Sequence, residues 1–270
     1  MKLLLDDPPF STAKEILTTI QQFGYQAYFV GGCVRDLLLN REIGDVDIAT
    51  SATPQEIMSI FDHVIPVGLE HGTVIVRYND QSYEVTTFRK EGKYSDQRHP
   101  DHVTFIPSIE EDLRRRDFTI NALAMNQTGE IIDLFNGKKD IENHLIRTVG
   151  DGKERFMEDP LRIIRALRFS SQIGFSIEEK TKQAMIEVKS QIENISVERI
   201  LVEFQKMFTG DEIETAIKHF TSLKIYEYVP IFKDHPKLIE FFPKRWVPLH
   251  SFGAVITLLH YIYPKETINH

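Results

Sequence analysis

The sequence has a single cysteine, Cys33, among its 270 residues. One cysteine excludes an internal disulfide framework and a zinc site built from cysteines, and it fits a reducing compartment. No apolar run approaches the roughly 20 residues that a membrane-spanning helix needs. The apolar start Met1–Leu5 is followed at once by two aspartates, so it is too short for the core of a signal peptide. We therefore expect a cytoplasmic protein.

The chain also lacks the excess of basic residues that marks indiscriminate binding of polyanions. It has 32 Lys and Arg against 40 Asp and Glu, with a formal net charge of −8. Any contact with a nucleic acid must therefore come from local basic patches. The sequence shows no internal repeats and no low-complexity segments. Its length and its charged fraction of 27% suit a globular protein of about two domains.

The most informative segment is residues 28–50, YFVGGCVRDLLLNREIGDVDIAT. An apolar run meets Gly31 and Gly32, and a short helix is predicted over Cys33–Asn40. Glycines let backbone N–H groups approach phosphate oxygens closely, and a helix N-terminus favours their negative charge. The order of strand, glycine turn and helix therefore indicates a polyphosphate site.

Asp45 and Asp47 stand two positions apart in the apolar run that follows. On a strand, residues i and i+2 project from the same face, so the carboxylates should share one side while Val46 and Ile48 pack on the other. Carboxylate oxygens are hard ligands that suit Mg²⁺, and a pair of metal ions can hold both oxygens of an in-line displacement. An Asp-x-Asp at a strand edge is by itself more often a solvated turn. Together with the glycine turn, it favours a site for Mg²⁺ and a polyphosphate.

Hydrophobic periodicity predicts the elements around this segment. A helix is expected over Ser11–Phe23, with Ser11 or Thr12 as its cap. Another short helix, Pro54–Phe61, has proline in its first turn. Glu130–Phe135 is predicted to be a short strand.

Two further strands, Gly72–Tyr78 and Ser82–Arg89, are predicted to form a hairpin. If Tyr83 and Val85 face the core, Glu84 lies on the polar face and is a candidate third carboxylate. An exposed strand glutamate without a role explains the same alternation equally well.

Lys90–His102 is charged and poor in apolar residues, so we expect a mobile loop next to the site. Leu113–Met125 (LRRRDFTINALAM) is predicted to be a helix that starts with three consecutive arginines. Such a row is most often a solvated face. Beside a carboxylate site, one of them is a candidate clamp for a triphosphate, because a guanidinium matches phosphate in a bidentate way.

The strand signal ends near residue 140 and helices follow, which places a domain boundary near residue 143. An amphipathic helix is predicted over residues 158–169, EDPLRIIRALRF. At 100° per residue from Asp159, Arg162, Arg165 and Arg168 fall on one side of the helix, and the apolar Ile163, Ile164 and Leu167 fall on the other. A solvated helix is the usual interpretation of this pattern. No acid within residues 162–168 pairs with the arginines, which favours an anionic partner.

Four motifs, GGCVRD, GDVDIAT, RRRDFTINALAM and EDPLRIIRALRF, occur in this order. Their order and spacing resemble the class II tRNA nucleotidyltransferases (the CCA-adding enzymes) and the related bacterial poly(A) polymerases. The resemblance covers roughly residues 11–210, and four ordered motifs are far more specific than one.

This resemblance implies an α+β fold: an N-terminal nucleotidyltransferase head with a mixed sheet and flanking helices, followed by an all-α neck and body. The ranges expected are 1–143 for the catalytic head, 144–211 for a helical neck that selects the nucleotide, and 212–270 for the start of the body. The tail domain is expected to be absent.

The resemblance also implies roles for individual residues. The metal, taken as Mg²⁺, would be bound by Asp45 and Asp47, to which Glu84 is added as a catalytic candidate. The residues that would contact the triphosphate are Gly32, Arg35 and Arg116. The residues that would read the base edge are Asp159 and Arg162, with support for the nucleotide from Arg165 and Arg168.

The base-reading role has a chemical reason. Cytosine and adenine each present an amino donor beside a ring-nitrogen acceptor, which fits a carboxylate paired with a guanidinium. Guanine and uracil present the opposite order, so Asp159 and Arg162 can exclude both. The choice between C and A must then come from the growing RNA end or from a movement of the loop. Pro160 makes Asp159 a candidate helix cap, which leaves less of its carboxylate for a base.

We therefore expect template-independent transfer of CMP and AMP from CTP and ATP to the tRNA 3′ end. The expected partners are the tRNA 3′ end, ATP and CTP, with no membrane. The alternatives are an A-adding enzyme or a poly(A) polymerase of the same family, or a non-catalytic RNA-binding module. Residues 64–74 (VIPVGLEHGTV) favour the CCA-adding type over the polymerase. Retention of both aspartates and the arginine row argues against the module.

Overall fold

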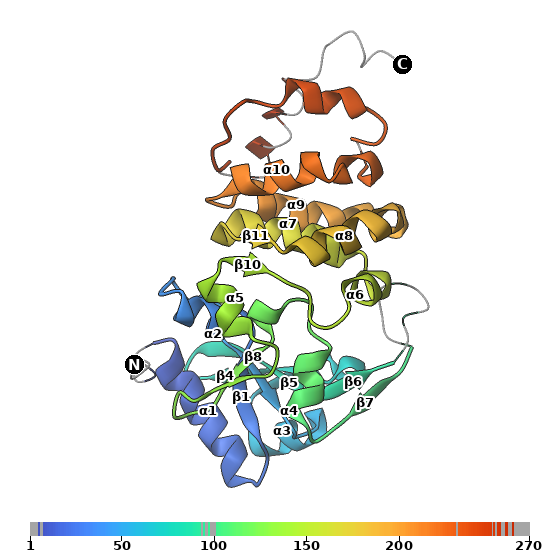
Figure 1. Cartoon of the computed structure of the whole chain (residues 1–270). Coiled ribbons are helices and arrows are strands. Elements are labelled where there is room, and N and C mark those ends of the chain that lie inside the picture. The colour runs from blue at the N-terminus through green and yellow to red at the C-terminus, as the bar shows by residue number, and fades with distance from the viewer. Residues whose placement is uncertain are drawn as a thin grey trace. The chain divides into compact units, whose positions relative to one another are not determined.

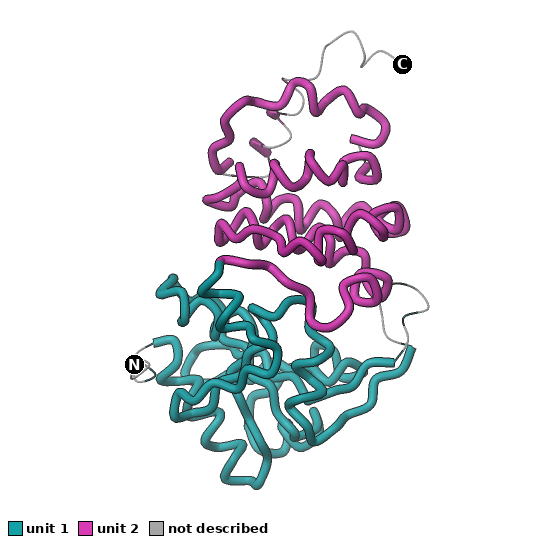
Figure 2. Tube along the Cα trace, viewed as in Figure 1, with its two compact units in different colours: residues 1–143 teal, residues 144–270 magenta. Residues whose placement is uncertain are grey.

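The computed structural model describes residues 8–92, 101–230 and 232–249, together with 5, 94, 97, 251, 253, 254, 257, 258 and 261. The chain forms two compact units, residues 1–143 and 144–270 (Figure 2). In these ranges no helix is long and apolar enough to span a membrane. The finer division of unit 2 into neck and body at residue 211 stays a prediction.

Unit 1 is built on a mixed seven-stranded sheet with the strand order β3-β4-β5-β2-β1-β8-β9. Strands β2 and β5 are parallel, and every other neighbouring pair is antiparallel. The predicted mixed sheet is therefore confirmed. The strands are β1 (Ala27–Val30), β2 (Asp47–Thr50), β3 (Val64–Gly68), β4 (Thr73–Tyr78), β5 (Gln81–Thr87), β8 (Leu123–Met125) and β9 (Ile131–Asp133).

Helices and a small ribbon complete unit 1. The ribbon consists of β6 (Arg89–Glu91) and β7 (Val103–Phe105), which form a separate two-stranded sheet (Figure 1). The helices are α1 (Phe10–Gln22), α2 (Gly32–Leu38), α3 (Pro54–Ile60), α4 (Ile109–Arg114) and α5 (Gly137–Glu142), with the 3₁₀ turns η1 (Leu69–His71) and η2 (Thr119–Asn121).

Two of the helix starts differ in how they are capped. Helix α1 has Pro9 at its N-cap without a side-chain hydrogen bond, so the prediction that Ser11 or Thr12 caps it is wrong. Helix α3 begins with a capping box, in which Thr53 and Glu56 each bond the other's backbone N–H. The predicted helices themselves are present at both places.

The helix predicted over Leu113–Met125 is wrong. Helix α4 ends at Arg114, and residues 123–125 form β8. The Asp117 carboxylate accepts the N–H of Phe118 at 2.8 Å, a local bond that competes with helix continuation. All residues of β8 are 0% exposed. A short apolar run that is buried on both faces cannot be told from a helix by periodicity alone.

Unit 2 is largely helical. Its two short strands, β10 (Leu145–Ile146) and β11 (Ser176–Ile177), pair in parallel, so the expectation of an all-α second part is wrong in this detail. Its α-helices are α6 (Gly152–Glu158), α7 (Leu161–Ile173), α8 (Glu179–Val188), α9 (Val197–Phe208) and α10 (Ile213–Ser222), and its 3₁₀ turns are η3 (Lys189–Asn194), η4 (Ile225–Tyr228) and η5 (Pro236–Phe241).

The helix predicted over residues 158–169 is broken at Asp159. Helix α6 ends at Glu158 and α7 begins at Leu161. Asp159 between them is extended, with φ −144° and ψ 100°. The following proline explains the break, because proline disfavours the helical conformation of the residue before it.

Gly137→Ala is expected to destabilise unit 1 by about 1–3 kcal/mol, the usual cost of overpacking. A Cβ at this position would lie 2.3 Å from the carbonyl oxygen of Thr119 and 3.0 Å from Leu123 Cδ2. Chemical denaturation measures the change. Gly44→Ala is the matched control, since a Cβ there has nothing within 4 Å. Equal stability of the two variants would contradict the prediction.

Candidate functional site

Two of the predicted carboxylates lie side by side on the central strands of unit 1. Parallel pairing of β2 with β5 places Ile48 opposite Val85. Asp47 and Glu84 each come one residue earlier, so they are also neighbours across the two strands. Ile48 and Val85 are buried at 1% and 0% exposure, which makes their face the core face. Since side chains alternate along a strand, Asp47 and Glu84 share the opposite face.

Asp45 lies just before β2, on the exposed segment that leads into it, so only Asp47 belongs to the strand itself. Val46 between them is buried, at 5% exposure, so the predicted alternation holds through this segment. The pKa of Asp47 is raised to about 6, first by burial and then by the charge of Glu84; Arg116 opposes the rise and Asp45 adds to it. The three carboxylates therefore create a negative potential that a cation would relieve.

This donor set fits a hard divalent cation that is completed by its substrate. Within the described ranges, no three His, Cys, Asp or Glu side chains are gathered into a metal site of their own. Mg²⁺ does not need such a cage, because it is usually held by one or two carboxylates together with water and substrate phosphates. Asp45 and Asp47 would supply that number of ligands.

The glycine turn between β1 and α2 lies against an arginine. Gly31 has φ 74° and ψ −130°, which a residue with a side chain adopts only with strain. A Cβ added to Gly31 would lie 3.0 Å from Nη1 of Arg116. Glycine is therefore required here both for the backbone angle and for the close approach of the guanidinium.

The three consecutive arginines have different surroundings. Arg114 is 60% exposed and pairs with Glu111 at 3.5 Å. Arg115 forms ion pairs with Asp112 at 2.8 Å and Glu91 at 3.1 Å, and it points into a buried charge network. Of the three, Arg116 is the arginine at the glycine turn. Its Nε is buried without a hydrogen-bond partner.

Arg35, the other predicted phosphate contact, is held firmly within unit 1. Its Nε and Nη2 each donate to the Asp36 carboxylate at 2.9 Å, and its Nη1 donates to Asn121 Oδ1 at 2.7 Å. The backbone oxygen of Asn121 accepts from Arg116 Nη1 at 3.5 Å. Asn121 thus connects the two arginines, and no sequence motif by itself had assigned it a place in the site.

The arginine row of α7 is present, but its charges are compensated. Nε of Arg168 lies 2.6 Å from Oε2 of Glu203, and Nη1 of Arg165 lies 3.8 Å from its Oε1. Arg162 pairs with Glu158 at 2.6 Å. The interpretation that these arginines lack an acidic partner within the protein is therefore wrong. The acid that compensates Arg165 and Arg168 comes from α9, which local spacing cannot reveal.

Asp159 is also held by α9. Its Oδ2 accepts from Nη2 of Arg199 at 2.8 Å, and its Oδ1 accepts the N–H of Leu161 at 3.1 Å. Asp159 thus spends one carboxylate oxygen on a backbone N–H of the first turn of α7, as the sequence suggested, although the N-cap residue itself is Pro160. Arg199 and Glu203 stand one helical turn apart on α9 and contact both ends of the predicted row. Neither residue could be found from local spacing, because α9 lies far along the chain from the arginine row.

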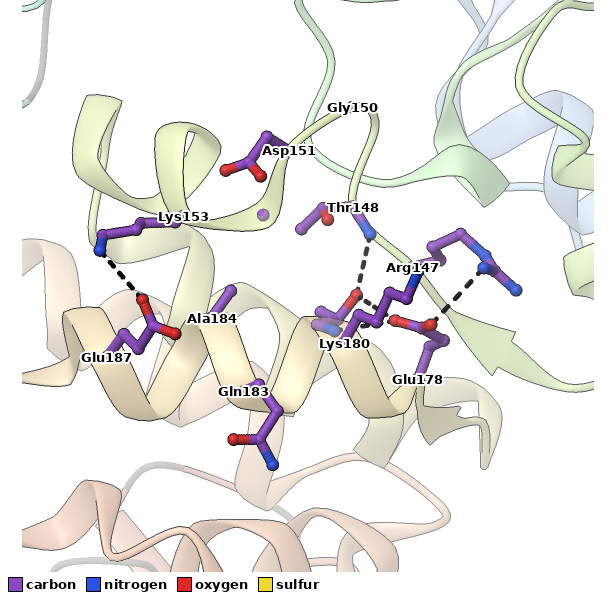
Figure 3. Close-up of a pocket in the computed structure, with 12 residues that line it drawn as sticks. Arg147, Thr148, Gly150, Asp151, Lys153, Glu178, Lys180, Gln183, Ala184 and Glu187 are labelled. Atoms are coloured by element: carbon purple, nitrogen blue, oxygen red, sulfur yellow. Dashed lines mark hydrogen bonds and ion pairs between the residues drawn. The ribbon is translucent and has the colours of Figure 1, made fainter.

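Unit 2 also contains a cavity of about 660 Å³ between the segment 147–153 and α8 (Figure 3). Basic and acidic side chains pair around it, as Lys153 does with Glu187 at 3.0 Å and Arg147 with Glu178 at 3.6 Å. None of the predicted site residues lines it. Of the predicted mobile loop Lys90–His102, residues 93, 95, 96 and 98–100 lie outside the described residues, and residues 90 and 91 belong to β6. The mobility of this segment stays a prediction.

Comparison with known proteins places the chain among nucleotidyltransferases. The model of the Poly A polymerase head domain matches residues 27–147, and the model of the probable RNA- and SrmB-binding site of polymerase A matches residues 174–235. The CCA-adding enzyme of Oceanobacillus iheyensis is 53% identical over 262 residues, which are 97% of this chain. The chain belongs to the poly(A) polymerase and tRNA nucleotidyltransferase family.

Solved structures of the family are similar in fold. The CCA-adding enzyme of Bacillus stearothermophilus in complex with CTP has a TM-score of 0.80 and 46% identity, covering 86% of this chain and 57% of that one. A tRNA nucleotidyltransferase complexed with a primer tRNA and an incoming ATP analogue has a TM-score of 0.67 and 28% identity, covering 84% and 65%. The chain spans 66% of the Oceanobacillus protein. It thus corresponds to somewhat under two thirds of these family members.

Asp47→Asn is expected to stabilise unit 1 against unfolding at pH 8 without divalent cations. The shift of the Asp47 pKa from 3.8 to about 6 means that the ionised carboxylate destabilises the folded state. The gain on substitution is about 2 kcal/mol, at 1.36 kcal/mol per pKa unit with a discount for residual solvent. As the pH falls below 6, the folded wild type takes up a proton and the difference shrinks, to vanish near pH 4.

Urea denaturation at pH 8, 6 and 4 measures this difference. Asp62→Asn, at an exposed position of the same unit, is the control and should change stability by less than about 0.5 kcal/mol. If Asp47→Asn is no more stable than this control at pH 8, the ionised Asp47 carboxylate does not destabilise the folded state and the prediction is wrong.

Proposed function

We propose that this chain carries the nucleotide-binding and catalytic part of a CCA-adding enzyme. It would transfer CMP and AMP from CTP and ATP to a tRNA 3′ end and release pyrophosphate. The observation that carries the proposal is the pairing of β2 with β5, which puts Asp47 and Glu84 on one polar face within electrostatic range of Arg116. Relatives named as CCA-adding enzymes, and the family structures with CTP and with primer tRNA, support the same chemistry.

The triphosphate is assigned to the glycine turn and its two arginines. Gly32 opens α2, and the guanidinium of Arg116 packs on the turn before it. A planar guanidinium binds phosphate oxygens in a bidentate way, and backbone N–H groups of a glycine turn approach them closely. Arg35 is already oriented by Asp36 and Asn121, so little rotamer entropy is lost when it binds.

The carboxylate face is assigned to catalysis. Asp45 and Asp47 would hold Mg²⁺, in a family that generally uses divalent metals, and Glu84 adds negative charge beside them. A metal held there would supply Lewis-acid chemistry, which would lower the pKa of the attacking hydroxyl and neutralise charge on the departing pyrophosphate. Asp47 and Glu84 lie on paired strands and Asp45 directly precedes β2, so strand pairing limits how far these carboxylates can move.

Selection of the base is assigned to Asp159 and Arg162 of unit 2. Arg199 orients the Asp159 carboxylate, and Glu158 orients the Arg162 guanidinium. An acceptor and a donor fixed in this way match the donor–acceptor edges of cytosine and adenine and mismatch those of guanine and uracil. Arg165 and Arg168 would support the nucleotide from positions set by Glu203.

A transfer assay tests the function. The chain is incubated with Mg²⁺, labelled CTP or ATP, and tRNAs that end before, within or after the CC sequence. Addition of CMP to the first two and of AMP to the third is expected. Addition of AMP alone would indicate an A-adding enzyme, repeated AMP a poly(A) polymerase, and no transfer a non-catalytic RNA-binding module.

In the same assay, Asp45→Ala should abolish transfer of both nucleotides, whereas Asp62→Asn should retain it. Normal turnover by Asp45→Ala would contradict the assignment of Asp45 to the metal.

Asp159→Ala is expected to relax the selection of nucleotides more than it weakens triphosphate binding. Loss of one hydrogen-bonding partner in such a site costs about 1–3 kcal/mol, which corresponds to a loss of discrimination against UTP and GTP of roughly 5- to 150-fold. Ratios of kcat/KM for the four nucleotides measure it, with Asp211→Asn, exposed in the same unit, as control. Unchanged selectivity in Asp159→Ala would place base reading elsewhere.

A further inference from the structure

Asp112 on α4 is a fully buried carboxylate, with its side chain 0% exposed. Its Oδ1 accepts from Nε and Nη2 of Arg115 at 3.0 and 2.8 Å, and from the N–H of Arg89 at 3.4 Å. Its Oδ2 accepts from Nη2 of Arg116 at 3.3 Å. The two oxygens therefore serve different partners. A buried carboxylate is tolerated only when it is paired in this way.

Arg116 depends on Asp112 for its orientation. Asp112 is the one acidic partner that the described part of the chain gives to Arg116. The other contact of its guanidinium, to the backbone oxygen of Asn121, is long at 3.5 Å. The guanidinium lies close against the turn, because Nη1 is 3.0 Å from the place that a Cβ on residue 31 would take and that glycine leaves open. Asp112 thus supplies the charged contact that holds this guanidinium beside the turn.

We propose that Asp112 is a positioning residue for triphosphate binding, which acts by holding the Arg116 guanidinium against the glycine turn. The inference deepens the proposed function and rests on it. An arginine left mobile must be ordered when the ligand binds, at a cost of up to about 2 kcal/mol of rotamer entropy. A guanidinium ordered beforehand avoids that cost, so Asp112 raises affinity without touching the nucleotide.

Arg115 makes it possible to separate positioning from simple stabilisation. It shares the carboxylate of Asp112 and makes the shorter contacts with it, but it also pairs with Glu91 at 3.1 Å. Asp112→Asn removes the acidic partner of Arg116 and leaves Arg115 paired with Glu91. Arg115→Met removes more of the buried network and leaves the Asp112–Arg116 pair in place.

The test is calorimetric titration of the full 270-residue chain with CTP and with CMP in Mg²⁺ buffer. Asp112→Asn should weaken CTP about 10-fold and CMP less than about twofold, because only CTP carries the outer phosphates that need the guanidinium. Arg115→Met should stay within about threefold of wild type for both ligands. In the double variant Asp112→Asn/Arg116→Ala, the loss should equal that of Arg116→Ala alone, since a residue that acts through Arg116 has no effect in its absence.

Three results would overturn the positioning role: additive losses in the double variant, equal weakening of CTP and CMP, or an Arg115→Met loss as large as that of Asp112→Asn. Thermal unfolding of every variant shows whether it is folded. If Asp112→Asn is unfolded, Asp112→Glu takes its place: it keeps the charge and should bind CTP within about threefold of wild type. A folded Asp112→Glu as weak as Arg116→Ala would equally overturn the role.

The same titrations distinguish this inference from the proposed function. If the wild-type chain does not bind CTP more tightly than CMP, both the proposed function and the positioning role of Asp112 are contradicted. Preference for CTP that is lost in Arg116→Ala but kept in Asp112→Asn would sink the positioning role alone and leave the proposed function standing.

Discussion

Parallel pairing of β2 with β5 forces two carboxylates together on one face of the sheet. Ile48 pairs with Val85 and both side chains are buried on the core side. The preceding residues, Asp47 and Glu84, must therefore both lie on the opposite face. Burial of Asp47 disfavours its charged form, the nearby charge of Glu84 adds to that effect, and the raised pKa of Asp47 expresses the free-energy cost. The fold thus keeps an electrostatic stress in the unliganded unit 1, and a cation bound there would relieve it.

Around the proposed phosphate site the opposite principle applies, because the arginines are already paired. Arg35 is bonded to Asp36 and Asn121, and Arg116 to Asp112. Such pairs do little for stability by themselves, since desolvation offsets much of the attraction. What they do is fix donors in space before a ligand arrives. The neighbouring carboxylates of Asp47 and Glu84 thus repel each other in the absence of a cation, whereas Arg35 and Arg116 are already oriented before a ligand binds.

In unit 2 as well, the side chains proposed to bind the nucleotide are held in place by ion pairs. Glu203 of α9 pairs with Arg165 and Arg168, and Arg199 pairs with Asp159. Helix α9 contributes no residue to the proposed base-reading site, but its ion pairs orient the side chains of that site. The break at Asp159 also releases its carboxylate from the helix, so that it can bond the first turn of α7 and Arg199 together.

The sequence by itself determined whatever depends on near neighbours along the chain. The alternation around Asp47, the glycine turn and the apolar stripe of α1 follow from local periodicity and backbone preference, and the four ordered motifs led to the family. Tertiary structure decided what depends on distant partners. It placed Glu84 beside Asp47, made residues 123–125 a strand rather than a helix, and supplied Glu203 to arginines that looked unpaired. The physical reason is that strand pairing and buried ion pairs join residues far apart in sequence, and spacing along one segment carries no record of its partner.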